Sequence, residues 1–188
     1  YPLKLLAMPG GVLQQATNAT KCEDCPAGGY CDQVGAADRG EVFKQCPYGT
    51  YNPKTAARSI ASCIACEPGK ANGEREATKH ADCEVCPRGS FTDKNGTKEC
   101  APCPEGTYAD KEGQTQCQTC EAGHYCPESS REQTKCPRDT YNPLPGQFEE
   151  EACIDCPDNS ITHGPGQNAK SSCVCNVDSF NSVADPND

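Results

Sequence analysis

The chain has 188 residues and a net charge of −10 at pH 7. It contains no Trp and only 20 Leu, Ile, Val and Phe residues, which is too little apolar material for one sizeable core. A chain so acidic and so poor in apolar residues would be disordered unless something other than core burial held it together. The acidic balance also argues against a nucleic-acid partner, because phosphate contacts need Lys and Arg.

The cysteines supply the missing stabilisation. There are 18 of them, a density typical of disulfide scaffolds, and disulfides persist outside the cytosol. Sequons at Asn18 and Asn95 predict N-linked glycan and fit the same compartment. No run of 18 apolar residues occurs, so the sequence predicts no membrane-spanning segment. We therefore expect an extracellular or cell-surface protein that passes through the secretory pathway.

The chain divides into four predicted parts. Residues 1–21 are interpreted as the tail of an upstream unit or a docking segment, because the apolar stretch is too short and interrupted for a signal peptide. Residues 22–116 form a first long cysteine-rich repeat, and 117–175 form a second, incomplete one. Residues 176–188 begin a further module or linker. The two long repeats align because Cys22, Cys25 and Cys31 map onto Cys117, Cys120 and Cys126 at a constant shift.

A shorter unit recurs inside the long repeats, every 17 residues from Cys83 to Cys100 and on to Cys117. Each unit reads Cys-Pro-x-Gly-Ser/Thr-aromatic, then a polar turn-rich run, then Cys-x-x-Cys. Repeats this regular indicate a linear array in which each unit contacts its neighbours. Because Pro and Gly recur and no 3.6-residue period persists, we expect an elongated array of small disulfide-rich repeats. These would be short two-stranded β ribbons and turns, with little or no helix and no single core.

Each unit carries its own turn and its own aromatic residue. The glycine two residues after Pro predicts a turn with Pro second and Gly at positive φ, and Asp139, which replaces it once, tolerates positive φ. The aromatic residue that follows is expected to cover the disulfide as a miniature core. Asp93–Gly96 and Asp110–Gly113 are the predicted hairpin tips. The turn glycines are Gly49, Gly89 and Gly106, and the aromatic residues are Tyr51, Phe91, Tyr108 and Tyr141.

The tandem Cys-Pro-x-Gly-Thr-Tyr and Cys-x-x-Cys motifs, interrupted by Cys-Pro-Ala-Gly-Gly-Tyr-Cys, resemble the ephrin-receptor-like cysteine-rich repeats. The resemblance runs from Cys22 to Cys175. The motifs are more distantly similar to tumour-necrosis-factor-receptor and EGF-like modules. The resemblance implies a disulfide-bonded extracellular fold but no particular function, since such repeats occur in receptors, adhesins, matrix proteins and protist surface coats.

The resemblance, taken with the repeat, implies a disulfide pairing. The cysteine before Pro would join the first cysteine of the next Cys-x-x-Cys, giving Cys66–Cys83, Cys86–Cys100, Cys103–Cys117 and Cys156–Cys173. For the remaining quartets a crossed pairing like that of the receptor modules is predicted: Cys25–Cys46, Cys31–Cys63, Cys120–Cys136 and Cys126–Cys153. A nested pairing, Cys25–Cys31 with Cys46–Cys63, stays open, because sequence alone does not fix connectivity. Cys22 and Cys175 are left unpaired, so the segment is interpreted as part of a longer array.

Other chemistry of the Cys-x-x-Cys pairs fits less well. Paired Cys-x-x-Cys motifs suit tetrahedral zinc, but the repeated Pro-x-Gly-aromatic pattern and the sequons favour disulfides. Redox catalysis would need a thioredoxin-like βαβ context, and none is visible. No catalytic constellation or calcium-binding pattern is found. We therefore expect no enzyme activity, no metal and no cofactor.

Two functions remain. The first is a structural segment, such as a rod, stalk or filament building block, of an extracellular or cell-surface glycoprotein assembly. Its partners would be other chains of that assembly, copies of itself included. The alternative is a ligand-binding receptor-like ectodomain or adhesin. The structural reading is preferred because the residues between the cysteines are mostly small and polar, with few Tyr, Trp and Arg clusters of the kind that dominate binding interfaces.

Overall fold

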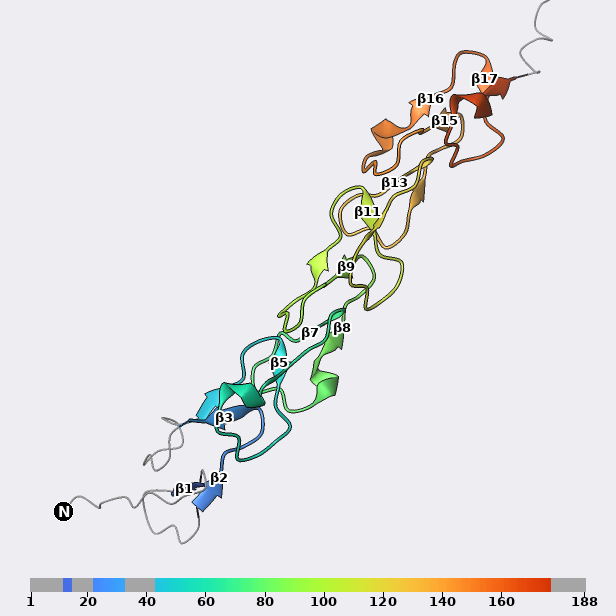
Figure 1. Ribbon diagram of the computed structural model, residues 1–188. Helices are drawn as coiled ribbons and strands as arrows, with labels where there is room; N and C mark the ends of the chain where they lie inside the picture. The colour runs from blue at the N-terminus through green and yellow to red at the C-terminus, as the bar shows by residue number, and fades with distance from the viewer. Residues whose placement is uncertain (1–11, 15–21, 33–42, 177–188) are drawn as a thin grey trace, which may run out of the picture. The chain divides into compact units, whose positions relative to one another are not determined.

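The computed structural model describes residues 12–14, 22–32 and 43–176. This part of the chain contains nine two-stranded antiparallel sheets and four single-turn 3₁₀ helices, with no α-helix (Figure 1). The chain forms two compact units. The first comprises Tyr1–Cys86 and Thr92–Cys100, and the second comprises Pro87–Phe91 and Ala101–Asp188. The predicted fold class of small disulfide-rich β ribbons without a single core is confirmed.

The strands are only two or three residues long. In chain order they are β1 (Val12–Gln14), β2 (Cys22–Asp24), β3 (Gly29–Cys31), β4 (Phe43–Gln45), β5 (Thr50–Tyr51), β6 (Ile64–Ala65), β7 (Lys70–Ala71), β8 (Glu84–Val85), β9 (Ser90–Phe91), β10 (Ala101–Pro102), β11 (Thr107–Tyr108), β12 (Gln118–Thr119), β13 (His124–Tyr125), β14 (Thr134–Lys135), β15 (Thr140–Tyr141), β16 (Ile154–Asp155), β17 (Ser160–Ile161) and β18 (Val174–Cys175). The 3₁₀ helices are η1 (Ile60–Ser62), η2 (His80–Asp82), η3 (Glu150–Ala152) and η4 (Lys170–Ser172).

Five ribbons are built in the same way. The two residues after Gly49, Gly69, Gly89, Gly106 or Asp139 pair with the two residues inside the next Cys-x-x-Cys. In β5 and β6, for example, Thr50 lies opposite Ala65 and Tyr51 lies opposite Ile64. We call each such repeat a module and name it by the cysteine that begins its turn. The eight modules begin at Cys25, Cys46, Cys66, Cys86, Cys103, Cys120, Cys136 and Cys156.

The turns differ from the prediction in one respect. In the Cys46 module the Thr50 N–H donates to the carbonyl of Pro47 at 3.2 Å, and the Thr50 hydroxyl donates to the same oxygen at 2.7 Å. Proline is therefore the first residue of the turn and not the second. Gly49 is the third residue, and its φ of 76° is the left-handed conformation that this position requires. The same hydroxyl bond is made by Ser90 and Thr107, which explains why Ser or Thr follows the glycine in these three modules.

The 3₁₀ helices explain why modules with the same ribbon have disulfide loops of two different lengths. Four disulfides close loops with a sequence separation of 17, and each of these loops contains one of the four 3₁₀ helices. Two disulfides have a separation of 14, and their loops contain no 3₁₀ helix. A 3₁₀ turn has about three residues, so the longer modules differ by one added turn just before the closing cysteine.

The predicted turns are present at Asn95–Gly96 and Glu112–Gly113, but they are not tight hairpin tips. Residues 92–100 separate β9 from β10, and 109–117 separate β11 from β12. The connection is longer than a two-residue hairpin because the disulfide loop lies between the paired strands.

The buried residues are cysteines and small polar residues. The aromatic residues Tyr51, Phe91, Tyr108 and Tyr141, which were expected to cover the disulfides, are only half-buried, so they are not the most buried residues of their modules. The residue that follows the aromatic position is buried instead. In chain order these buried residues are Cys31, Asn52, Asn72, Thr92, Ala109, Cys126, Asn142 and Thr162.

The buried asparagines tie neighbouring modules together. Asn52 donates from its side-chain amide to the carbonyl of Gly29 at 2.7 Å and accepts from the Lys54 N–H at 3.0 Å. Asn142 donates from its side-chain amide to the carbonyl of His124 at 2.9 Å in the same way. A buried amide with both groups satisfied stabilises the fold, whereas an unsatisfied one would cost about 1–3 kcal/mol.

Candidate functional site

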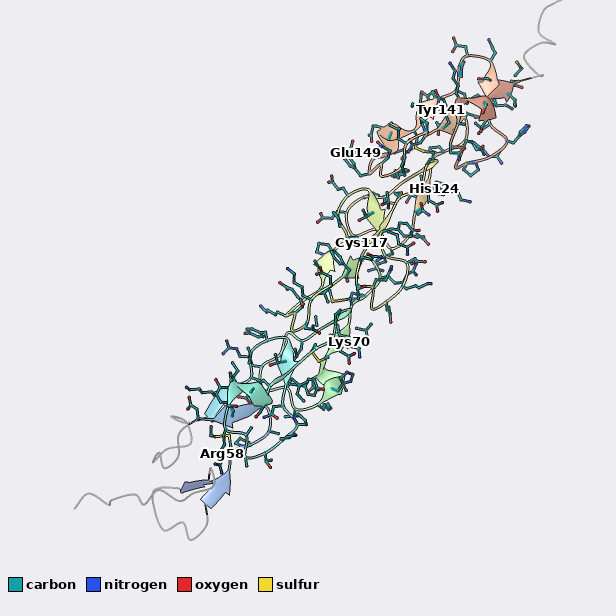
Figure 2. All side chains as sticks on the ribbon, in the orientation of Figure 1. Arg58, Lys70, Cys117, His124, Tyr141 and Glu149 are labelled. Carbon is teal, nitrogen blue, oxygen red and sulfur yellow. A yellow bond between two sulfur atoms is a disulfide. The ribbon has the colours of Figure 1, made fainter. Side chains whose placement is uncertain are left out.

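The candidate site is the set of disulfides and backbone contacts that join one module to the next. Eight disulfides lie in the described part of the chain (Figure 2). Four of them have the partners that the repeat implied: Cys66–Cys83, Cys86–Cys100, Cys103–Cys117 and Cys156–Cys173. Because these sulfur atoms are bonded to each other, they are not available as thiolate ligands for zinc.

The predicted crossed pairing is wrong. The structure has the nested bonds in both quartets: Cys25–Cys31, Cys46–Cys63, Cys120–Cys126 and Cys136–Cys153. It therefore contains none of the crossed bonds Cys25–Cys46, Cys31–Cys63, Cys120–Cys136 and Cys126–Cys153.

The turn geometry explains the nested pairing. Cys31 lies three residues after the turn glycine Gly28. In the next module Asn52 holds the same buried position, three residues after Gly49. The turn folds this position back beside the first cysteine, so the Cα atoms of Cys25 and Cys31 lie 6.0 Å apart, within the range for a disulfide. Cys46 is then left to close its own module with Cys63, as Cys66 does with Cys83. From Cys25 and Cys120 onward, the matched cysteines of the two long repeats thus have matched partners, although the boundary at residue 117 stays a prediction.

The two cysteines expected to be unpaired differ in what the structure describes. Cys175 is exposed and free. It lies in β18 opposite Ser160. Cys22 begins β2, but its side chain lies outside the described residues.

Backbone hydrogen bonds join each module to the one that follows. The N–H of the turn glycine donates to the carbonyl of the buried residue in the next module, so that the Gly49 N–H reaches the Asn72 carbonyl. The same bond recurs at 2.8–2.9 Å within each compact unit, from Gly28 to Asn52, Gly69 to Thr92, Gly89 to Ala109, Gly106 to Cys126 and Gly123 to Asn142. These six bonds join a main-chain donor to a main-chain acceptor, so they do not involve the outward side chains.

The contacts also reach the second module along the chain. A Cβ atom added to Gly49 would lie 2.0 Å from the carbonyl oxygen of Gly96, two modules away, and one added to Gly106 would lie 2.2 Å from that of Gly146. Gly28, Gly89 and Gly123 face carbonyl oxygens of the second following module in the same way. Real Cβ atoms do not approach oxygen so closely, so these turns need glycine for space as well as for positive φ.

The Asn95 sequon lies in one of these docking loops. Asn95 is exposed, whereas the Thr97 hydroxyl donates to the Lys94 carbonyl at 3.0 Å and contacts the Thr92 hydroxyl at 2.8 Å. The Asn95 side chain is thus accessible to solvent, and its glycosylation stays a prediction. Asn18 lies outside the described residues.

Two half-buried tyrosines have acidic neighbours. Burial raises the pKa of Tyr108, and the charge of Asp110 raises it further. Burial also raises the pKa of Tyr125, whose hydroxyl donates to the Glu150 carboxylate at 3.3 Å. Both phenols therefore stay protonated at neutral pH and act as hydrogen-bond donors.

The ring of a third tyrosine, Tyr48, makes cation–π contacts with two positively charged side chains. Arg75 and Lys98 each lie 4.8 Å from the centre of the Tyr48 ring, within the range of cation–π interactions. Tyr48 remains 39% exposed. The cluster comes from three successive modules, because Tyr48 lies in the Cys46 turn and the two cations lie in the loops of the next two modules.

These features define a class of protein, the disulfide-rich repeat in which short β ribbons dock through their backbones. In the comparison with family models, residues 73–120 and 93–131 match the family described as tyrosine-protein kinase ephrin type A/B receptor-like. The resemblance predicted from the sequence is thereby confirmed over residues 73–131. The search of curated proteins gave no match.

The match and the eight disulfides together indicate an extracellular domain. In the part of the chain that the structure describes, no helix is long and apolar enough to cross a membrane. Among the same residues, no group of three or more His, Cys, Asp and Glu side chains is placed to hold a metal ion.

Proposed function

We propose that this chain is a non-catalytic structural segment of an extracellular or cell-surface glycoprotein assembly, acting as a rod, stalk or filament building block. The observation that carries the proposal is the repeated docking bond from each turn glycine to the next module. Contacts of this kind add modules in series and do not require a shared apolar core. The function of such a segment is to hold other parts of an assembly at a set spacing.

Small-angle scattering of the full chain tests the proposal. A compact domain of this length would have a radius of gyration of about 16 Å. A rod made of serially docked modules should give a clearly larger value and a distance distribution with a long tail. A radius close to the compact value would show that modules fold back onto one another, and the rod proposal would then be abandoned.

The alternative, a ligand-binding ectodomain or adhesin, is favoured by one observation. Tyr48 with Arg75 and Lys98 is an exposed aromatic and cationic cluster in an otherwise acidic chain. Tyrosine and arginine are enriched at the centres of protein interfaces. If the chain binds an extracellular partner through this cluster, Tyr48→Ala should weaken the capture of that partner, while Tyr141→Ala in the second compact unit should not. Equal capture by both variants would argue against this site.

A further inference from the structure

Most inner modules make the same two hydrogen bonds to the modules that follow them. The turn glycine donates to the carbonyl of the buried residue in the next module, and that buried residue donates to a loop carbonyl in the module after it. Gly123 donates to the Asn142 carbonyl at 2.8 Å, and the Asn142 N–H donates to the Gln167 carbonyl at 2.9 Å. A buried residue therefore needs a following module to satisfy its own N–H group.

The Cys136 module departs from this pattern at Asp139. The Asp139 N–H donates to the Thr162 hydroxyl at 2.9 Å, and the Thr162 N–H donates to the Asp139 carboxylate at 2.9 Å. Thr162 is the buried residue of the Cys156 module, and its hydroxyl also donates to the Gly164 carbonyl at 3.0 Å. The acceptor that a following module would have provided is thus supplied from within the chain, by a side chain of the preceding module.

The side chain of Asp139 also fills the space that a following module would need. At the equivalent glycines an added Cβ would lie 2.0–2.4 Å from the carbonyl oxygen of the second following module. Asp139 has the same left-handed backbone, with a φ of 66°, but it carries a Cβ. A carbonyl group cannot approach it as closely as one approaches Gly106 or Gly123.

The next turn position and the next first-cysteine position of the repeat also carry different residues. Asn159, with a φ of 61°, replaces the turn glycine of the Cys156 module. Asn176 stands where the next module would have its first cysteine, because its N–H donates to the Asn159 carbonyl just as the Cys156 N–H donates to the Asp139 carbonyl. Two glycines and one cysteine are therefore replaced at successive framework positions. Cys175 lies one residue before the framework position and takes no part in the disulfide ladder.

We propose that Asp139 caps the stack of modules. Its carboxylate replaces the acceptor of a following module, and its Cβ excludes that module from the docking position used by the inner modules. Terminal repeats of array proteins commonly differ from the inner ones for this reason. A further module, such as one from a second copy of the chain, therefore cannot dock against Asp139 in the way that the inner modules dock. The inference depends on the docking geometry and not on the proposed role as a rod.

Hydrogen exchange of the disulfide-intact full chain, followed by NMR for each amide, tests the cap. Asp139→Gly removes the carboxylate but keeps a residue suited to positive φ, so the turn should still form. The Thr162 amide should then exchange about tenfold faster or more, because it loses a hydrogen bond to a charged acceptor. Asp158→Ala changes a neighbouring exposed carboxylate and is the matched control. Equal Thr162 exchange in the two variants would overturn the capping role.

Two further variants test the two parts of the proposal separately: the hydrogen-bond acceptor at residue 139, and the exclusion of a docked module by a side chain at the turn position. Asp139→Asn keeps a side-chain oxygen and should preserve most of the Thr162 protection. Gly123→Asp places the same side chain in an inner module and should displace the docked loop, so the Asn142 and Gly166 amides should exchange faster. Native protection of both amides in Gly123→Asp would show that a side chain at this position does not block docking.

Discussion

At the residue scale, the turn glycines show how one missing side chain serves two purposes. Gly49 adopts a φ of 76°, which glycine reaches at little cost, and its bare Cα lies against the Gly96 carbonyl. Asp139 shows the converse, since it keeps the backbone conformation but loses the close contact. Positive φ alone therefore does not explain why glycine occupies the inner turns.

The first prediction compares two glycines of the same compact unit. Gly49→Ala should destabilise docking by roughly 1–3 kcal/mol, because it adds both backbone strain and a clash with the Gly96 carbonyl. Gly73→Ala is the control, since its added Cβ would lie 3.8 Å from the nearest atom, the Lys98 carbonyl oxygen. The measurement is the opening free energy of the Asn72 amide from hydrogen exchange. Similar effects of the two substitutions would contradict the role of close contact.

At the scale of the element, each ribbon depends on the position three residues after the turn glycine. This position is filled by Asn52, Asn72 or Asn142 in some modules and by a cysteine in the Cys25 and Cys120 modules. Cysteine and asparagine hold the chain at this buried position through different interactions. A disulfide fixes the position covalently, whereas asparagine fixes it through hydrogen bonds to the preceding module.

The nested pairing predicts a distinct peptide map. Trypsin cleavage of the unreduced protein should leave peptide 22–39 unlinked to peptide 45–54, because Cys25 and Cys31 are bonded within the first peptide. Peptide 45–54 should instead be linked to peptide 59–70 through Cys46 and Cys63. Mass spectrometry before and after reduction distinguishes the two cases. A crossed pattern would join peptide 22–39 to both of the others.

The sequence predicted the ribbons and the bonds such as Cys66–Cys83 because spacing repeats with the fold. It did not predict that Cys31 occupies the place of Asn52, because a cysteine motif gives no sign of which positions are buried. The docking between modules was missed for a similar reason. Backbone donors and acceptors leave no trace in residue type except the glycine, and that glycine was explained by the turn alone.

At the scale of the whole molecule, stability is distributed along the chain. Within each compact unit the docking bonds and close contacts reach the first and second following modules. The buried residues form no single apolar core that distant modules share. A local defect should therefore loosen the modules within this reach and leave those beyond it intact.

Removal of one disulfide tests this limit. Cys103→Ser with Cys117→Ser should destabilise that module by about 2–5 kcal/mol and speed amide exchange in the Cys86 and Cys120 modules. The Cys156 module is the third following one, so its Ser160 and Val174 amides should keep their protection. The measurement is exchange resolved by residue in the otherwise oxidised protein. Loss of protection in the Cys156 module to the same extent would show that the second compact unit unfolds as one body.

Docking through the backbone has a consequence for how such repeats change during evolution. The inner modules share their cysteines, a glycine at the turn and a small residue at the buried position, and we expect most other residues to be replaceable without loss of docking. Sequence similarity between relatives will then fade well before the geometry does. Here the family match covers residues 73–131, whereas two-stranded ribbons extend from Gly29 in β3 to Cys175 in β18. Relatives of this chain should be easier to recognise by the spacing of cysteine and glycine than by overall identity.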